Sequence, residues 1–211
     1  MDRRKFIISA TTGSAAAAGT ALGSPSGLSA PTPTEIKGPF YPIIAQQDKD
    51  FDLTRIEGKE DAAEGQLIII EGGVYDTSGA PVVGATVDLW QANTFGKYRH
   101  PHDPNPAPLD DNFQGWAIFP SGKNGGFRFK TIFPGTYPAS ANWTRPPHIH
   151  FKVTKMGYVE LITQMYFPDQ ELNQSDLLLQ RKSREEQKLM VADKVSDEPE
   201  TYRFKIVIQK A

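Results

Sequence analysis

Short runs in which apolar and polar residues alternate are the feature that most constrains the fold of this chain. Side chains alternate between the two faces of a β-strand, so a period of two predicts a strand with one buried face. Residues 126–133 and 201–208 show this period most clearly. The residues that share a face are Phe127, Phe129 and Thr131 in the first run, and Tyr202, Phe204, Ile206 and Ile208 in the second. The runs at 67–75, 85–90, 148–153 and 160–167 also have the composition of strands.

Turn-forming residues separate these runs. Gly and Pro together account for 35 of the 211 residues, from 18 Gly and 17 Pro, which favours a turn-rich β protein over a helical bundle. Several short strands divided by turns predict an all-β fold, an antiparallel β-sandwich with long loops. Only residues 170 to about 192 have a helical pattern, and their charged run at 181–186 is expected to face solvent. We therefore expect one short C-terminal helix.

Charge and cysteine content exclude several classes of protein. Lys and Arg number 23 against 25 Asp and Glu, a formal net charge of -2, whereas nucleic-acid-binding domains usually carry a basic excess. The chain has no Cys, which excludes disulfides, zinc–thiolate sites, iron–sulfur clusters and thiol nucleophiles. Any metal site must therefore use nitrogen and oxygen ligands.

The first thirty residues have the layout of an export signal. Arg3, Arg4 and Lys5 precede a mildly apolar stretch and small residues, and this stretch is too short and too rich in Gly and Ser for a stable membrane anchor. The paired arginines resemble a twin-arginine signal, which exports folded proteins. We predict a signal at 1–30, an extended arm at 31–65 and one sandwich domain at 66–211, in a protein located in the periplasm or outside the cell.

All four histidines fall in two His-x-His pairs, His100 with His102 and His148 with His150. On a strand, residues i and i+2 point to the same face, so His148 and His150 can reach one metal ion. The first pair contains Pro101 and is followed by a Pro-rich segment, which favours a loop. Pattern alone leaves open a copper or zinc site built from all four histidines.

Six motifs occur in an order that points to a known family. They are Gly-Pro-Phe-Tyr-Pro at 38–42, Val-Asp-Leu-Trp-Gln-Ala-Asn at 87–93, Gly-Lys-Tyr-Arg-His at 96–100, Pro-Gly-Thr-Tyr-Pro at 134–138, Arg-Pro-Pro-His-Ile-His-Phe at 145–151 and Leu-Ile-Thr-Gln-Met-Tyr-Phe at 161–167. This series resembles the intradiol ring-cleavage dioxygenases, the family of protocatechuate 3,4-dioxygenase and catechol 1,2-dioxygenase. The resemblance implies a prealbumin-like sandwich and an enzyme that acts on a small aromatic diol with O₂.

The resemblance also implies a mononuclear non-haem Fe(III) cofactor. Its ligands would be Tyr98, Tyr137, His148 and His150, with Tyr137 and His150 axial and the other two equatorial beside a hydroxide. Phenolate oxygens suit this ion because a multivalent cation makes a phenol much easier to deprotonate. His100 and His102 are not ligands under this assignment.

Two further residues, Arg145 and Gln164, carry over from the same motifs, and Tyr137 and Tyr41 have additional expected roles. Arg145 would stabilise negative charge on the bound catecholate, and Gln164 would form hydrogen bonds within the oxygen pocket. Tyr137 would leave the metal and help to accept a substrate proton, and Tyr41 would line the substrate mouth. The expected product is a cis,cis-muconate-type dicarboxylic acid. A non-catalytic binding module on the same sandwich is the alternative from another class, and an oligomer is compatible with the sequence.

Overall fold

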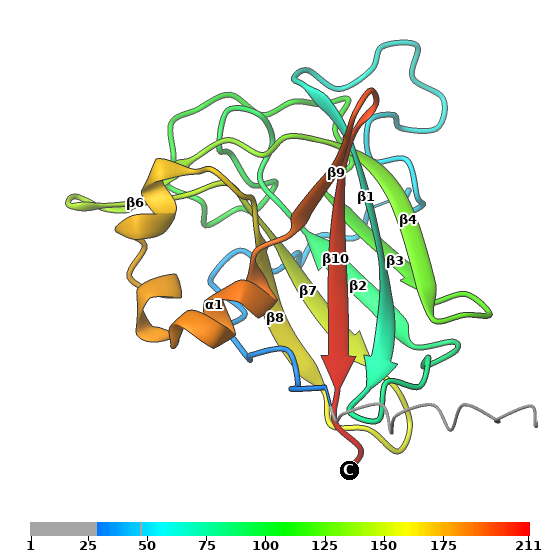
Figure 1. Ribbon diagram of the computed structural model, residues 1–211. Coiled ribbons are helices and arrows are strands. Elements are labelled where there is room, and N and C mark those ends of the chain that lie inside the picture. The colour runs from blue at the N-terminus through cyan, green and yellow to red at the C-terminus, as the bar shows by residue number, and fades with distance from the viewer. Residues whose placement is uncertain (1–28, 47) are drawn as a thin grey trace, which may run out of the picture.

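The computed structural model describes residues 29–46 and 48–211, which form two packed β-sheets beside a small helical segment (Figure 1). The predicted export signal lies almost wholly outside the described residues. The strands are β1 (Leu67–Asp76), β2 (Thr86–Trp90), β3 (Trp116–Pro120), β4 (Gly126–Ile132), β5 (Tyr137–Ser140), β6 (Trp143–Arg145), β7 (His148–Thr154), β8 (Leu161–Tyr166), β9 (Asp193–Asp197) and β10 (Glu200–Ile208).

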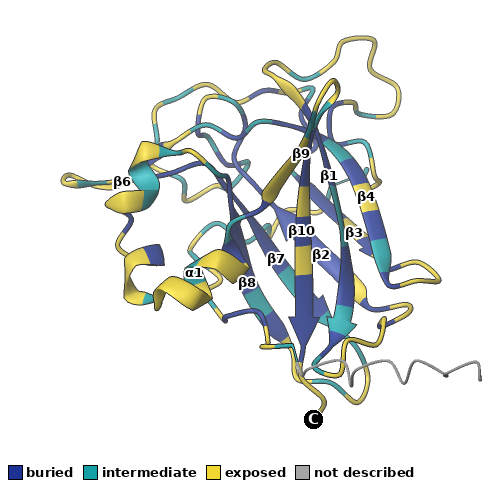
Figure 2. Ribbon diagram, in the orientation of Figure 1, coloured by how far each residue is buried: buried dark blue, intermediate teal, exposed yellow. Residues whose placement is uncertain are grey.

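The two four-stranded sheets have the orders β4-β1-β10-β9 and β3-β2-β7-β8, and β5 pairs with β6 in a separate hairpin. Their inner faces bury one large apolar core, in which Ile70, Phe129, Phe151 and Phe204 are almost inaccessible to solvent. Figure 2 shows most strands buried in large part, with the edge strand β9 exposed, and the helical segment largely exposed. The prediction of an all-β sandwich is confirmed.

Two details of the sequence-based prediction are wrong. The long central strands β1 and β10 run parallel, with Ile70 opposite Tyr202, although every other strand pair is antiparallel. Strands β3, β5, β6 and β9 were not anticipated. Each is only three to five residues long, which is too short for alternation to stand out from the surrounding loops.

The helix expected over residues 170–192 is broken into three pieces. They are the 3₁₀ turns η1 (Glu171–Gln174) and η2 (Leu179–Arg181), and the helix α1 (Arg184–Met190). Ser183 starts α1 through a reciprocal capping box with Glu186, which satisfies backbone groups at the helix start. One short C-terminal helix is therefore confirmed, and the 181–186 run faces solvent mainly as predicted.

The arm at 31–65 contains no helix or strand among its described residues. Its first part lies against β8, the edge strand of the sheet that contains β7. Hydrogen bonds join Glu35 N to the Ile162 carbonyl and the Thr163 hydroxyl to the Pro33 carbonyl. Among the residues that the structure describes, no helix is long and apolar enough to cross a membrane.

Candidate metal centre

Strand β7 separates the core from a second, polar environment. Ile149, Phe151 and Val153 point into the main apolar core, so the alternation of a strand directs His148 and His150 to the opposite face. In the sheet register His148 lies beside Tyr166 of β8, and His150 lies between Trp90 of β2 and Gln164 of β8. Both histidines are nevertheless buried, because the arm and the loops cover this outer face.

The two imidazoles converge through their Nε2 atoms, which are 3.2 Å apart. The Nδ1 atom of His148 lies 2.7 Å from the Pro146 carbonyl oxygen, a contact that holds a proton on Nδ1 and leaves a lone pair on Nε2. His150 stacks face to face on Trp90, with ring centroids 4.7 Å apart. The Pro146 carbonyl and the Trp90 indole thus fix the orientations of the two rings.

Tyr98 approaches the histidines from the loop that follows β2. Its hydroxyl oxygen is 3.5 Å from the Nε2 atom of His148, and its backbone N–H donates to the Asp103 carboxylate. Gly96, just before it, has φ +76°, and a Cβ there would lie 2.0 Å from the Thr136 carbonyl oxygen. Only glycine permits this close approach, which brings the Tyr98 loop against the segment that carries Tyr137.

Tyr137 begins β5 and lies directly opposite Arg145 of β6 in the hairpin register. Its ring is perpendicular to that of Tyr98, with centroids 5.4 Å apart, and 5.7 Å from that of His148. Phe40 of the arm contacts the rings of both tyrosines. The four residues predicted as metal ligands therefore come together from a loop, a hairpin and a central strand.

Burial controls the protonation of all four groups. It raises the pKa of the Tyr98 hydroxyl well above its usual value, and the neighbouring Tyr137 raises it further. Burial also raises the pKa of Tyr137, while the positive charge of Arg145 acts in the opposite direction. Burial and Arg145 both lower the pKa of His148 and His150 far below the value of free histidine. Neutral imidazoles are the form in which histidine binds a metal.

This donor set fits a hard metal ion. Two nitrogen ligands at roughly 2.1 Å from one ion are roughly 3 Å apart, which agrees with the 3.2 Å between the histidine Nε2 atoms. Within the part of the chain that the structure describes, His150 Nδ1 is buried without a hydrogen-bond partner, so the ring relies on Nε2 for a polar contact. Two phenols supply the oxygen atoms that hard cations prefer.

The histidine pair at 100 and 102 lies apart from this cluster in a loop. Their ring centroids are 5.6 Å apart, and His102 is exposed. Among residues 29–46 and 48–211, no group of three or more His, Cys, Asp or Glu side chains is arranged to hold a metal. The structure thus does not assemble the four-histidine site that pattern alone left open.

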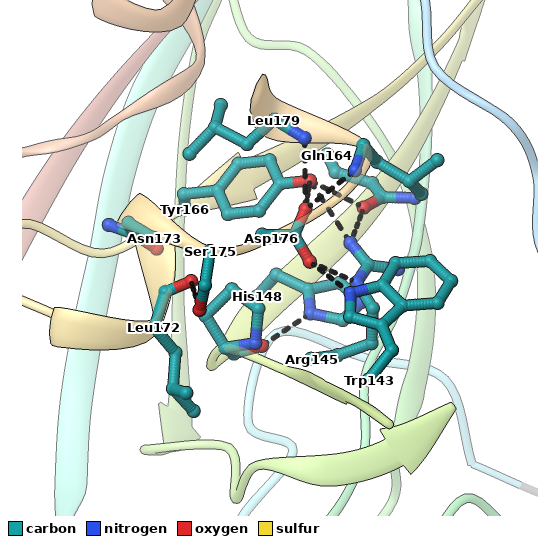
Figure 3. A network of polar contacts seen from close by, with 12 residues as sticks. Trp143, Arg145, His148, Gln164, Tyr166, Leu172, Asn173, Ser175, Asp176 and Leu179 are labelled. Carbon is teal, nitrogen blue, oxygen red and sulfur yellow. Dashed lines mark hydrogen bonds and ion pairs between the residues drawn. The ribbon is translucent and has the colours of Figure 1, made fainter. Parts of the chain in front are cut away.

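Arg145 lies in a buried polar network that Figure 3 shows. Its Nε donates to the Asp176 carboxylate at 2.7 Å, and one terminal nitrogen donates to Gln164 Oε1 at 2.6 Å and to the Tyr166 hydroxyl at 3.0 Å. Burial opposes the charged form, but Tyr166, Tyr137 and Asp176 together raise the pKa of Arg145. Arg145 is therefore a fixed cation beside Tyr137.

The structure also locates the other two predicted site residues. Gln164 is fully buried, and its amide nitrogen donates to the Ile36 carbonyl, so it links Arg145 to the arm. The Tyr41 hydroxyl donates to Asp88 and accepts from Lys152, while its ring packs edge-on against Trp90. Tyr41 thus contacts the support of His150, and its role at a substrate mouth stays a prediction.

The sequence analysis did not place Asp176 or Trp90 in the site. Asp176 lay inside the predicted helix, although a Ser-Asp pair before three leucines is a typical helix start. Trp90 is buried in a small cluster with Tyr98 and Tyr137, apart from the main core. The pairing of strands β2 and β7, which sequence alone did not supply, is what brings it to His150.

Comparison with known proteins identifies the family. A family model described as Dioxygenase matches residues 36–210. The chain belongs to this dioxygenase family. It is 37% identical over 156 residues to the protocatechuate 3,4-dioxygenase beta chain of Burkholderia cepacia, covering 71% of this chain and 66% of that protein. It is 29% identical over 165 residues to hydroxyquinol 1,2-dioxygenase of a Rhizobium species, covering 72% of this chain and 52% of that protein.

Solved structures agree with this assignment. The dioxygenase domain of a dioxygenase–carbohydrate-binding fusion from Streptomyces sp. SirexAA-E superimposes with a TM-score of 0.65 at 26% identity, covering 86% of this chain and all of that chain. The chain spans from about half to two thirds of the length of the curated relatives it matches. The resemblance to the intradiol dioxygenases is confirmed at the level of the family.

Proposed function

We propose that this dioxygenase-family chain is an Fe(III)-dependent intradiol enzyme that cleaves a catechol-type substrate between its two hydroxyl-bearing carbons. The convergence of Tyr98, Tyr137, His148 and His150 in one buried cluster carries the proposal. Both atoms of O₂ enter the product, so a catechol yields a cis,cis-muconate-type dicarboxylic acid. The relatives named above are dioxygenases of protocatechuate and hydroxyquinol, and the substrate here belongs to the same class of aromatic diols.

The four ligands would hold the metal through His148 Nε2, His150 Nε2 and the two phenol oxygens. When bound, Fe(III) supplies a Lewis acid that chelates the diol and makes its ring reactive toward O₂. The side chains of the site are oriented before substrate arrives, since Trp90 and the Pro146 carbonyl already fix both imidazoles. Such preorganisation is a major source of catalytic power in enzymes.

Tyr137 and Arg145 have complementary tasks in this proposal. The Tyr137 hydroxyl oxygen would accept a substrate proton, and the raised pKa of this group favours its protonated form. The guanidinium of Arg145 stabilises the negative charge that develops on the substrate oxygen as the ring loses aromaticity. Arg145 lies opposite Tyr137 in the hairpin register, so proton acceptance and charge stabilisation occur side by side.

Colour is the first test of the proposal. Purified protein reconstituted with ferric iron should turn red to burgundy through tyrosinate-to-iron charge transfer, and O₂ uptake should match the dicarboxylate formed from a panel of catechol, protocatechuate and hydroxyquinol. A colourless preparation that stays iron-free after reconstitution would reject the ligand assignment. A coloured protein that binds catechols without consuming O₂ would instead support a binding module.

We further propose that the protein acts outside the cytoplasm. The Arg3-Arg4 pair in the predicted signal supports twin-arginine export of the folded, iron-loaded protein. The test is the location of full-length protein in a bacterial host, compared with an R3K/R4K variant. Export should fail in the variant, and equal export of both proteins would contradict the twin-arginine assignment.

A further inference from the structure

A fully buried carboxylate lies beside the proposed metal centre and is not one of its ligands. Asp176 is inaccessible to solvent and is surrounded by donors in Figure 3. The donors to its two oxygens are Arg145 Nε at 2.7 Å, Leu179 N at 2.9 Å, Leu178 N at 3.2 Å, the Tyr166 hydroxyl at 3.2 Å and Trp143 Nε1 at 3.3 Å. A buried charge of this kind persists only where it is paired and fully hydrogen-bonded.

The position of Asp176 links three parts of the molecule. Its carboxylate accepts hydrogen bonds from Trp143 and Arg145 of β6 and from Tyr166 of β8. It also accepts one from the backbone N–H of Leu179 in η2. Among the described residues, Arg145 is its ion-pair partner. The remaining contacts hold the carboxylate in place, so Asp176 provides a rigid anchor for the guanidinium.

Among the residues that the structure describes, three hydrogen-bond acceptors hold Arg145 along one side. Its Nε is bound by Asp176, and one terminal nitrogen is bound by Gln164 and Tyr166. A guanidinium carries five N–H groups in a fixed plane, so fixing Nε and one terminal nitrogen fixes the orientation of the other terminal nitrogen. Both fixed nitrogens face the sheet and η2, and the strand pairing puts Tyr137 across from Arg145.

We propose that Asp176 is a positioning residue, which holds the plane of Arg145 so that its remaining edge faces Tyr137 and the substrate. This inference rests on the proposed function and assigns Asp176 no contact with substrate. Without the carboxylate, the Arg145 Nε loses its acceptor and the side chain can rotate about its flexible stem. The expected defect is in the step that Arg145 assists, with the iron ligands unaffected.

The main test is a double-mutant cycle in the iron-loaded full chain. Asp176→Asn should keep the visible band and KM but lower kcat by about 10–100-fold, the usual cost of removing a residue that orients a functional group. If Asp176 acts through Arg145, then D176N/R145A should be no slower than R145A alone. Losses that multiply in the double variant would overturn the proposal. Asp110→Asn is the matched control, because Asp110 is a buried carboxylate that accepts backbone N–H groups, and its kcat should not change.

A second readout does not depend on activity. In the iron-free protein, the Arg145 Nε–H should be protected from solvent exchange in arginine-selective ¹H–¹⁵N spectra, with R145K identifying the signal. D176N should abolish this protection, and an unchanged signal would overturn the proposal. Should D176N fail to fold, Asp176→Glu shifts the carboxylate by one methylene, and unchanged kcat and protection in that variant would also overturn it. If wild-type protein cleaves no catechol, the proposed function fails while the exchange measurement still decides whether Asp176 orders Arg145.

Discussion

The protein contains two His-x-His pairs that differ in their backbone setting. His148 and His150 lie on a central strand, with both Nε2 atoms 3.2 Å apart in a buried cluster. His100 and His102 lie in a loop around Pro101, and the exposed His102 donates its backbone N–H to the ring of His100. An arginine precedes each pair, but Arg145 is buried against Asp176, whereas Arg99 lies partly exposed beside Asp111.

The comparison shows that the strand backbone orients the two imidazoles, which the His-x-His motif by itself does not do. A strand directs residues i and i+2 to one face, and its neighbours β2 and β8 supply aromatic rings that stack on them, Trp90 on His150 and Tyr166 on His148. The loop pair has the same spacing, but its backbone forms a turn at residues 101–102 and not a strand.

Removal of either strand histidine should eliminate the metal. His148→Ala and His150→Ala each delete a proposed ligand, so the loss of iron affinity should exceed the roughly 10–100-fold typical of changes to groups that support a ligand. His100→Ala and His102→Ala should bind iron as the wild type does. Iron content and the visible spectrum after reconstitution measure both. Loss of metal in the loop variants would revive the four-histidine site.

The tyrosines should control the colour of the protein. Tyr98→Phe and Tyr137→Phe remove a phenolate donor while keeping the ring in place, so each should bleach or strongly shift the charge-transfer band. Tyr75→Phe is a matched control, because Tyr75 lies on the other sheet, in β1. Absorption titrations with ferric iron provide the measurement. Unchanged bands in both ligand variants would exclude tyrosinate ligation.

Substitution of Arg145 should slow the reaction, whereas substitution of Arg99, which precedes the loop histidines, should not. Arg145→Ala should retain iron and colour but lower kcat by about 10²–10³-fold, as expected for the loss of one preorganised charge-stabilising donor. Lys should rescue only in part because it lacks the planar fork. Arg99→Ala should keep wild-type kcat. Single-turnover kinetics with anaerobically loaded catechol and an O₂ pulse would separate binding from reaction, and a wild-type rate in R145A would leave Arg145 a purely structural role.

The two histidines on β7 should also make the free energy of unfolding depend on pH. Burial and Arg145 lower the pKa of His148 and His150 in the folded state, so below about pH 6.5 the unfolded chain binds protons that the folded chain does not. The iron-free protein should therefore lose up to about 1.4 kcal/mol per pH unit for each histidine as pH falls from 7 to 5. Above that range these groups add no pH dependence.

Urea unfolding of the iron-free protein at pH 5, 6 and 7.5 provides the measurement. A His148→Gln/His150→Gln variant should have a shallower pH slope than the wild type, because it lacks both buried imidazoles. A His100→Gln/His102→Gln variant should keep most of the slope. Equal slopes in all three proteins would show that the strand histidines are not held neutral in the fold.

Much of the fold could be predicted because alternation depends only on local residue order. The runs at 67–75, 148–153 and 201–208 became β1, β7 and β10 with nearly the predicted bounds. The direction of β10 could not be predicted in this way, because alternation is identical for a parallel and an antiparallel strand. The family motifs supplied the ligand set, and the strand spacing of His148 and His150 independently supported half of it.

The supporting residues were harder to predict because they act through long-range contacts. Asp176 reaches Arg145 across 31 positions of the sequence, and no periodic pattern links the two. Asp176 also explains why the predicted helix is broken. The Asp176 carboxylate accepts hydrogen bonds from the N–H groups of Leu178 and Leu179, which follow it in the sequence. This local contact competes with a continuous helix.

The alternation of β7 has a consequence for how this protein can change over generations. Odd-numbered residues of the strand, such as Phe151, belong to the folding core, and even-numbered residues, such as His150, belong to the centre on the other face. Substitutions at even positions therefore act first on the centre, whereas substitutions at odd positions act first on the apolar core. A library restricted to even positions of β7 and β8 should yield more variants with altered metal binding or reactivity than one of equal size at odd positions. Whether a β7 residue is odd- or even-numbered therefore decides whether its substitution acts first on the stability of the fold or on the chemistry of the centre.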